Sequence, residues 1–256
     1  MYSKETYEQA FALRKLGFTF KEISKKLNIP SHTTIYDWVG KGKLPHGKFL
    51  DPNYNKVSSE LAYIFGVIQG DGYASISKTK GCIGLDVKDK DFALVFKDKL
   101  EKWSGLKSSF KFRREKGLYI TRLYSLRATE FLKYFNIFNL SKASNKVRSN
   151  FLRGMFDSEG GVSGSNLKTP KTATRFIAVY NTNKQLILFV NDLIESLGIK
   201  VQNIDSRIKS GFTDYTLLFR LRIGGREYLQ KFKEKIGFSI ERKNRKLDEV
   251  LNSYIN

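Results

Sequence analysis

Hydrophobic positions in residues 1–40 recur every three or four residues, a spacing that predicts three short helices. Thr19 stands before the second apolar stripe and Ser31 before the third, and both residue types cap helix N-termini. Ile35 and Trp38 share one side of the third helix. We therefore predict a compact three-helix unit at the start of the chain.

The other side of the third helix carries His32, Thr33 and Tyr36. A helix, a short turn and a second helix with an exposed polar face form the arrangement that places a helix in the DNA major groove. Residues 1–42 resemble the helix-turn-helix units of resolvases and transposase-like proteins, although a three-helix module that contacts protein is the alternative. Residues 43–57 contain several glycines and prolines and are predicted to be a linker.

From residue 58 onward the pattern occurs twice. The segment LAYIFGVIQGDG at 61–72 has its counterpart in NFLRGMFDSEGG at 150–161, and each is an apolar helix that ends in an acid followed by glycine. Each copy continues as two strands, a helix, two strands and a helix. The pattern predicts an α+β fold of two pseudo-symmetric αββαββα repeats, at 58–145 and 146–256.

The later strands of each copy alternate apolar and basic residues, as in Phe110-Lys111-Phe112-Arg113. Side chains of a strand point alternately to its two faces, so one face would pack on helices while the other presents cations to water. An ordinary solvated sheet face is the alternative to a nucleic-acid surface. The candidate DNA-binding residues of the strands are Lys111, Arg113, Arg122, Arg207, Arg220 and Arg222.

Composition supports a polyanionic partner. The 256 residues include 46 Lys and Arg against 25 Asp and Glu, a formal net charge of +21, and the excess is spread over the whole chain. Such a balance favours nucleic acid or an anionic membrane, and no apolar run approaches the roughly 18 residues of a spanning helix. One cysteine excludes an intramolecular disulfide, and two histidines leave catalysis to carboxylates, lysines or metals.

The two apolar helices contain the candidate chemistry. Gly66 and Gly154 weaken the helices that contain them, so close approach of another backbone is the natural reason for glycine there. If the helices pack along these glycines, Asp71 and Glu159 become neighbours at their ends. Like charges at the negative ends of two helices are unfavourable unless a cation lies between them, and Mg²⁺ takes one or two carboxylates together with phosphate oxygens.

Residues 64–72 and 152–160 resemble the motif that names the LAGLIDADG homing endonucleases, and the resemblance covers residues 58 to 256. It implies a monomer whose antiparallel strands sit in the major groove and whose acids hold Mg²⁺ or Mn²⁺ to cleave both strands of a long, specific double-stranded DNA target. The candidate metal-site residues are Asp71 and Glu159, the implied acidic ligands, together with Gly70 and Ser158. Glu replaces Asp in the second motif, which keeps the carboxylate.

The resemblance also implies polar residues on the second strand of each copy and basic residues after its last helix. By local pattern these are Asp89 and Asn183, and Lys142 and Lys243, which would order water or balance phosphate charge.

Two other classes remain open: a catalytically inert transcription regulator and a maturase that binds intron RNA. The chain lacks a terminal His-Asn pair, so we expect a free-standing or intron-encoded protein rather than an intein, and the absence of a signal-peptide layout suggests an intracellular location, in cytoplasm, nucleoid or an organelle.

Overall fold

The computed structural model describes residues 2, 4–43, 51, 53–78, 80–167, 172–210 and 215–254. The chain forms two compact units, Met1–Pro52 with Ser104–Leu106, and Asn53–Trp103 with Lys107–Asn256. Residues 44–50 and 52 of the predicted linker lie outside the described residues. No helix in the described part of the chain is both long enough and apolar enough to span a bilayer.

The first unit has the three helices expected from its periodicity. They are α1 (Lys4–Lys15), α2 (Phe20–Lys26) and α3 (His32–Ile35), the last continued by a π-helical turn, η1 (Tyr36–Gly40). Thr19 caps α2 through a reciprocal pair of hydrogen bonds with Glu22, and the Ser31 side chain caps α3. The side chains buried between the helices are Ala10, Ile23, Ile29, Ile35 and Trp38.

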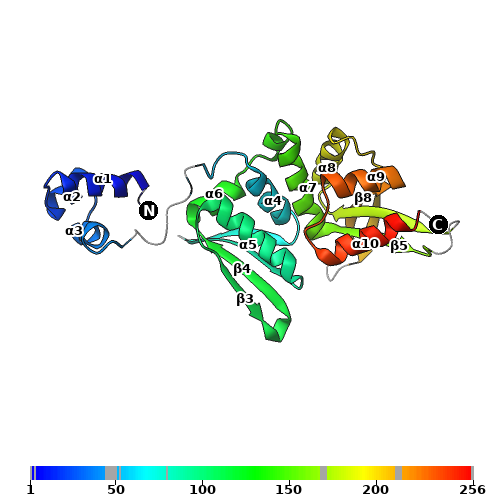
Figure 1. Ribbon diagram of the computed structural model, residues 1–256, viewed down its shortest axis with the longest axis horizontal. Helices are drawn as coiled ribbons and strands as arrows, with labels where there is room; N and C mark the ends of the chain where they lie inside the picture. The colour runs from blue at the N-terminus through cyan, green and yellow to red at the C-terminus, as the bar shows by residue number, and fades with distance from the viewer. Residues whose placement is uncertain are drawn as a thin grey trace. The chain divides into compact units, whose positions relative to one another are not determined.

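The second unit contains the two repeats (Figure 1). The first comprises α4 (Ser59–Ile68), β1 (Gly72–Ser77), β2 (Lys80–Val87), α5 (Lys90–Ser104), β3 (Ser109–Arg113), η2 (Arg114–Lys116), β4 (Leu118–Tyr124), α6 (Leu126–Lys133) and η3 (Ile137–Leu140). The second comprises α7 (Asn145–Glu159), β5 (Gly160–Ser165), β6 (Thr174–Asn181), α8 (Lys184–Ser196), β7 (Asn203–Ser210), β8 (Tyr215–Gly224), α9 (Arg226–Lys235) and α10 (Glu241–Asn252). The predicted α+β fold is confirmed, and α10 is an addition to the second repeat.

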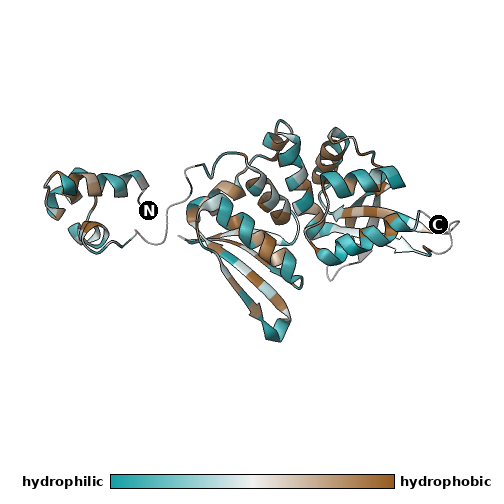
Figure 2. Ribbon diagram, viewed as in Figure 1, coloured by the Kyte–Doolittle hydropathy of each residue, from teal (hydrophilic) through white to brown (hydrophobic). Residues whose placement is uncertain are grey.

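Each repeat forms one antiparallel sheet, with strand order β1-β2-β4-β3 in the first and β5-β6-β8-β7 in the second. The registers correspond: Arg122 lies opposite Gly84 in the first sheet, and Arg222 lies opposite Ala178 in the second. Hydrophobic and hydrophilic residues alternate along β3 and β4, as Figure 2 shows. The helices therefore cover one face of each sheet, and we call the opposite face the outer face.

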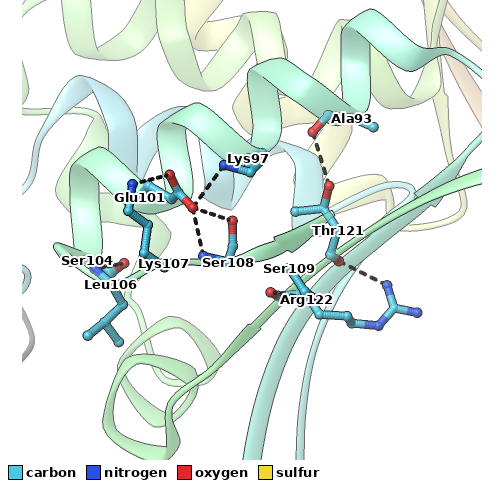
Figure 3. A network of polar contacts seen from close by, with 10 residues as sticks. All are labelled: Ala93, Lys97, Glu101, Ser104, Leu106, Lys107, Ser108, Ser109, Thr121 and Arg122. Atoms are coloured by element: carbon cyan, nitrogen blue, oxygen red, sulfur yellow. Dashed lines mark hydrogen bonds and ion pairs between the residues drawn. The ribbon is translucent and has the colours of Figure 1, made fainter. Parts of the chain in front are cut away.

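Polar contacts fix α5 on the first sheet (Figure 3). The Thr121 hydroxyl on β4 donates to the Ala93 carbonyl at 3.1 Å, which identifies the helix side of that strand. Burial alone would raise the pKa of Glu101, but the Ser108 backbone N–H at 2.8 Å and the Lys97 ammonium at 3.0 Å lower it to about 2. This carboxylate ties the end of α5 to the start of β3.

Candidate functional site

Two helices, one from each repeat, cross in the second unit (Figure 1). A Cβ built on Gly66 of α4 would lie 3.2 Å from the Gly154 Cα on α7 and would overlap the Phe151 carbonyl oxygen. A Cβ on Gly154 would overlap the Tyr63 carbonyl oxygen in the same way. Only glycine allows backbones to approach so closely, so these two positions bring the C-terminal ends of both helices together.

The adjoining helix ends carry the two candidate acids. α7 ends at Glu159, and Asp71 follows the last turn of α4. A Cβ on Gly70 would lie 2.6 Å from the Ser158 Cβ and 2.8 Å from the Glu159 Cγ, so Gly70 also lies in contact with the other repeat. The Asp71 side chain is exposed and Glu159 is half-buried.

The surroundings of Asp71 disfavour its negative charge. Partial loss of hydration raises the pKa of the Asp71 carboxyl, the nearby Lys243 ammonium opposes that rise, and the Asp89 carboxylate adds to it. A divalent cation beside Asp71 would relieve this cost.

The donor set suits a hard cation. Carboxylate oxygens at Asp71 and Glu159 are ligands that Mg²⁺ and Mn²⁺ prefer, and glycine at position 70 lets the α4 end lie directly against the Glu159 side chain. Among the described residues, no three His, Cys, Asp or Glu side chains gather into a complete metal site. The chain thus offers two acids, and other oxygen ligands would complete the coordination shell.

Lys243 lies in the first turn of α10 and is 6% exposed. Its ammonium donates to the carbonyl oxygens of Phe156 at 2.9 Å and Asp157 at 2.6 Å, near the end of α7. Burial lowers the pKa of Lys243 to about 8, although the Asp157 and Asp71 carboxylates oppose that shift. Lys142 is instead exposed in the turn between η3 and α7.

Asp157 is a buried acid whose role the sequence reasoning missed. It is 1% exposed, accepts the Tyr63 hydroxyl at 2.7 Å and the Ser239 backbone N–H at 2.8 Å, and thereby joins α4, α7 and the chain before α10. Burial raises the pKa of Asp157. A carboxylate directly after the apolar pair Met155-Phe156, two residues before Glu159, was the available signal.

The predicted positions of Asp89 and Asn183 on the second strands are wrong. β2 ends at Val87 and β6 at Asn181, so both residues lie two positions past a strand, at the start of the following helix. Asn183 caps α8 by accepting the Leu186 N–H. Asp89 accepts two hydrogen bonds from Arg242, at 2.7 and 2.8 Å, and this ion pair lowers the pKa of Asp89. Short polar side chains are favoured where they satisfy free N–H groups at helix starts.

The outer face of the first sheet carries Lys111, Arg113 and Arg122 together, as their register requires. Lys111 is exposed. Arg122 is held by Asp86 in a two-pronged ion pair, with Nη2 to Oδ2 at 2.8 Å, and this pair raises the pKa of Arg122. Its guanidinium also lies over the Tyr73 ring, 5.0 Å from the centroid. The sequence gives no local signal for this partner, because Asp86 comes from a different strand.

The second sheet departs from the expectation that Arg220 faces water. Arg220 is 5% exposed and donates to both Asp205 carboxylate oxygens, at 2.9 and 2.6 Å. Arg222 is more open and donates from Nε to the Asn203 side chain at 2.7 Å. Arg207 lies on β7, and its side chain is outside the described part of the structure. A cross-strand acid therefore converts Arg220 from a free cation into a paired, buried one.

In the first unit, His32, Thr33 and Tyr36 are all exposed on one helix. The Lys41 ammonium lies 4.9 Å from the Tyr36 ring centroid. These side chains are accessible to a partner, and their role remains a prediction.

Comparison with known proteins adds to this geometry. A family model described as a LAGLIDADG-like domain matches residues 146–237, which include Asp157 and Glu159 of α7. The uncharacterised protein MJ0398 of Methanocaldococcus jannaschii is 32% identical over 262 residues, covering 94% of this chain and 91% of that protein. The chain belongs to the LAGLIDADG family. A second uncharacterised protein of that organism, MJ0314, is 33% identical over 165 residues, covering 60% of this chain and 62% of its own length.

Solved structures agree with the family assignment at the level of fold. The crystal structure of I-DmoI in complex with DNA and Mn has a TM-score of 0.51 and 19% identity, and covers 71% of this LAGLIDADG chain and 98% of I-DmoI. I-DmoI in complex with DNA and Ca has a TM-score of 0.52 and 18% identity, covering 75% of this chain and 98% of that one. The two-repeat fold is therefore one that also occurs in a homing endonuclease.

Proposed function

We propose that this LAGLIDADG protein is a site-specific endonuclease that hydrolyses both strands of double-stranded DNA with divalent metal ions. The observation that supports the proposal is the close approach of Gly70, the neighbour of Asp71, to the Glu159 side chain at the ends of two helices packed through Gly66 and Gly154. Acids beside DNA phosphates, at the negative ends of helices, are unfavourable without a cation. The I-DmoI structures with DNA and Mn support the choice of partner and ion.

In this proposal Asp71 and Glu159 hold Mg²⁺ or Mn²⁺, with backbone oxygens at Gly70 and Ser158 beside them. The bound ion would supply charge neutralisation at the scissile phosphate and a more acidic attacking water. Lys243, held by the α7 carbonyls, contributes positive charge near Asp71. Asp89 orients Arg242, and Asn183 fixes the start of α8.

The outer-face cations bind the DNA. Lys111 and Arg113 are proposed to contact phosphates, while Arg122 and Arg222, at corresponding register positions, are oriented by Asp86 and Asn203. The first unit would add contacts from His32, Thr33 and Tyr36 and extend the target. We propose that one chain, acting as a monomer, suffices because it contains both repeats.

The test begins with target selection. Binding of the full chain to randomised duplexes in EDTA identifies a target, and Mg²⁺ is then added to that duplex. Asp71→Asn and Glu159→Gln should each lower the cleavage rate by at least about a hundredfold, since each loses a metal ligand. Affinity in EDTA should stay within about threefold, because removing a negative charge does not weaken phosphate contacts. Asp98→Asn, an exposed acid on α5, should cut like the wild type.

Each alternative gives a different result. A regulator would bind the selected duplex tightly and leave it intact in Mg²⁺, and a maturase would prefer the intron RNA to every duplex. Undiminished cleavage by the Asp71→Asn, Glu159→Gln double variant would refute the roles assigned to these acids.

A further inference from the structure

A small polar pocket of about 370 Å³ lies at one end of the second sheet, where β6 begins and β8 ends. The candidate metal site lies at the other end of β6, because Asn181 in the last position of that strand donates to the Gln69 carbonyl, two residues before Asp71. Six residues of β6 separate Arg175, which lines the pocket, from Asn181, a span of about 20 Å. The pocket is therefore distinct from the candidate metal site.

Two arginines line this pocket, and none of its described lining residues is acidic. In the described structure Arg175 is held by neutral groups only: its Nε donates to the Ser253 hydroxyl at 2.8 Å and its Nη2 to the Ser253 carbonyl oxygen at 3.0 Å. Its guanidinium also lies over the Tyr254 ring, 4.7 Å from the centroid. These contacts fix the guanidinium in place and leave its positive charge uncompensated.

Arg222 supplies a second oriented cation. Its Nε donates to the Asn203 side chain at 2.7 Å, and its guanidinium lies over the Phe176 ring, 5.4 Å from the centroid. Its acidic partner, Asp205, lies 3.4 Å from Nη2 but already accepts two shorter hydrogen bonds from Arg220. Because two arginines share this one carboxylate, positive charge is left over, and both arginines of the pocket contribute to its excess.

The first repeat is built differently at the corresponding end of its sheet. By strand register Gly81 corresponds to Arg175, and Arg122 corresponds to Arg222. A Cβ on Gly81 would overlap the backbone at the start of α6, so no space remains there for a longer side chain. Arg122 pairs with both carboxylate oxygens of Asp86. The excess of oriented positive charge is therefore a feature of the second repeat that the first repeat does not reproduce in its described residues.

We propose that Arg175 and Arg222 bind a phosphate group in this pocket. Both guanidiniums are held in place before any ligand arrives, and planar arginine donors match the geometry of phosphate oxygens. The Thr174 hydroxyl and the Gln202 side-chain amide line the same pocket and supply further donors. Arg222 lies on the outer face, so a phosphodiester of bound DNA is the expected source. In that case the inference rests on the DNA partner of the proposed function, although not on cleavage.

The experiment is a methylphosphonate scan of the selected duplex in EDTA, in which one phosphodiester at a time is made neutral. For the wild type, a neutral linkage at the contacted position should weaken binding by at least about fivefold. Arg175→Gln should weaken binding to the unmodified duplex by a similar factor and should abolish the effect of that one linkage. Arg222→Gln should abolish the effect of the same linkage. For each variant the slope of log affinity against log salt concentration should become shallower by about one unit.

Lys246→Gln is the matched control. Lys246 lies on α10 and pairs with Glu249, so its substitution removes one positive charge without touching the pocket. It should leave the effect of every neutral linkage unchanged. A purely structural role for Arg175, anchoring Ser253, would weaken binding to all duplexes alike and couple to no single linkage. Thermal unfolding should confirm that the variants fold, and Arg222→Gln provides the test if Arg175→Gln does not fold.

Calorimetric titration of the full chain with inorganic phosphate, in the absence of DNA, tests the second source of the same chemistry. Binding that Arg175→Gln abolishes and Lys246→Gln does not, with no coupled linkage in the duplex, would assign the pocket to a small phosphorylated ligand. The absence of both a coupled linkage and such binding would overturn the proposal. A coupled linkage in a duplex that stays intact in Mg²⁺ would support the phosphate site while refuting the nuclease.

Discussion

Lys243 shows how the surroundings of one side chain set its chemistry. The Lys243 ammonium donates to the carbonyl oxygens of Phe156 and Asp157 and is almost fully removed from water. Burial lowers the pKa of Lys243 to about 8. In the unfolded chain the same group titrates near its ordinary value of 10.5. Burying the charged form of Lys243 therefore makes folding less favourable. This cost disappears once Lys243 loses its proton in the folded protein.

Stability should respond to pH accordingly. Below pH 8 both states bind the proton, and between about pH 8 and 10.5 only the unfolded state keeps it, so stability rises with pH in that window. The free energy of unfolding of the wild type minus that of Lys243→Met should rise by up to about 3 kcal/mol from pH 8 to 10.5, measured by urea titration. A flat profile for Lys243→Met would contradict the assignment.

At the scale of elements, the crossing of α4 and α7 decides where the acids lie. Each helix accepts a glycine in its interior at a cost of about 1 kcal/mol relative to alanine. In return the backbones approach until Gly66 and Gly154 touch. The buried hydrogen bond from Tyr63 on α4 to Asp157 on α7 then fixes the relative rotation of the two helices.

Gly66→Ala and Gly154→Ala should each destabilise the protein. The added methyl group would meet a carbonyl oxygen of the other helix, and overpacking of this kind costs about 1–3 kcal/mol or more, which exceeds the gain in helix propensity. Urea unfolding should show the loss. Gly161→Ala on β5, where a Cβ meets nothing within 4 Å, should change stability by less than about 0.5 kcal/mol. Equal effects at the three positions would argue against a close crossing.

At the scale of the whole molecule, the net charge of +21 is organised by the minority of acids. Asp86 and Asp205 hold arginines on the outer faces, so these cations are oriented rather than mobile. The remaining exposed cations, such as Lys111, are available to phosphates. Fewer outer-face cations are therefore free to bind phosphates than the number of basic residues on the strands alone would indicate.

Two measurements distinguish the exposed cations from the paired arginines: the salt dependence of DNA binding and the stability of the fold. For Lys111→Ala, the slope of log affinity for DNA against log salt concentration should become shallower by about one unit, with stability unchanged. Arg220→Ala should instead lower the free energy of unfolding by about 1–3 kcal/mol, because Asp205 loses its buried partner. DNA binding is measured across a salt series, and stability is measured by urea unfolding. If Lys111→Ala and Arg220→Ala behaved alike in both measurements, the distinction between exposed and paired cations would be wrong.

Much of this organisation was predictable from local pattern. Helical periodicity indicated the three N-terminal helices, and the Thr19 cap followed from residue type. The repeated apolar helix with glycine and a terminal acid indicated two repeats of one fold, because period and capping chemistry are local properties of the chain. The positions of Asp89 and Asn183 were missed by two residues, since strand ends depend on pairing with β1, β4, β5 and β8 rather than on the strand's own residues.

The sequence by itself determined the elements, the duplication and the identity of the acids, because those depend on spacing along the chain. Only the tertiary structure decided which charges are free: Arg220 is buried by an acid on another strand, and Lys243 by the end of a helix 86 residues away. It alone also showed that Phe238 is buried against Phe156 and Phe232 whereas Phe138 is exposed. Burial and pairing depend on residues distant in sequence, so no local pattern can encode them.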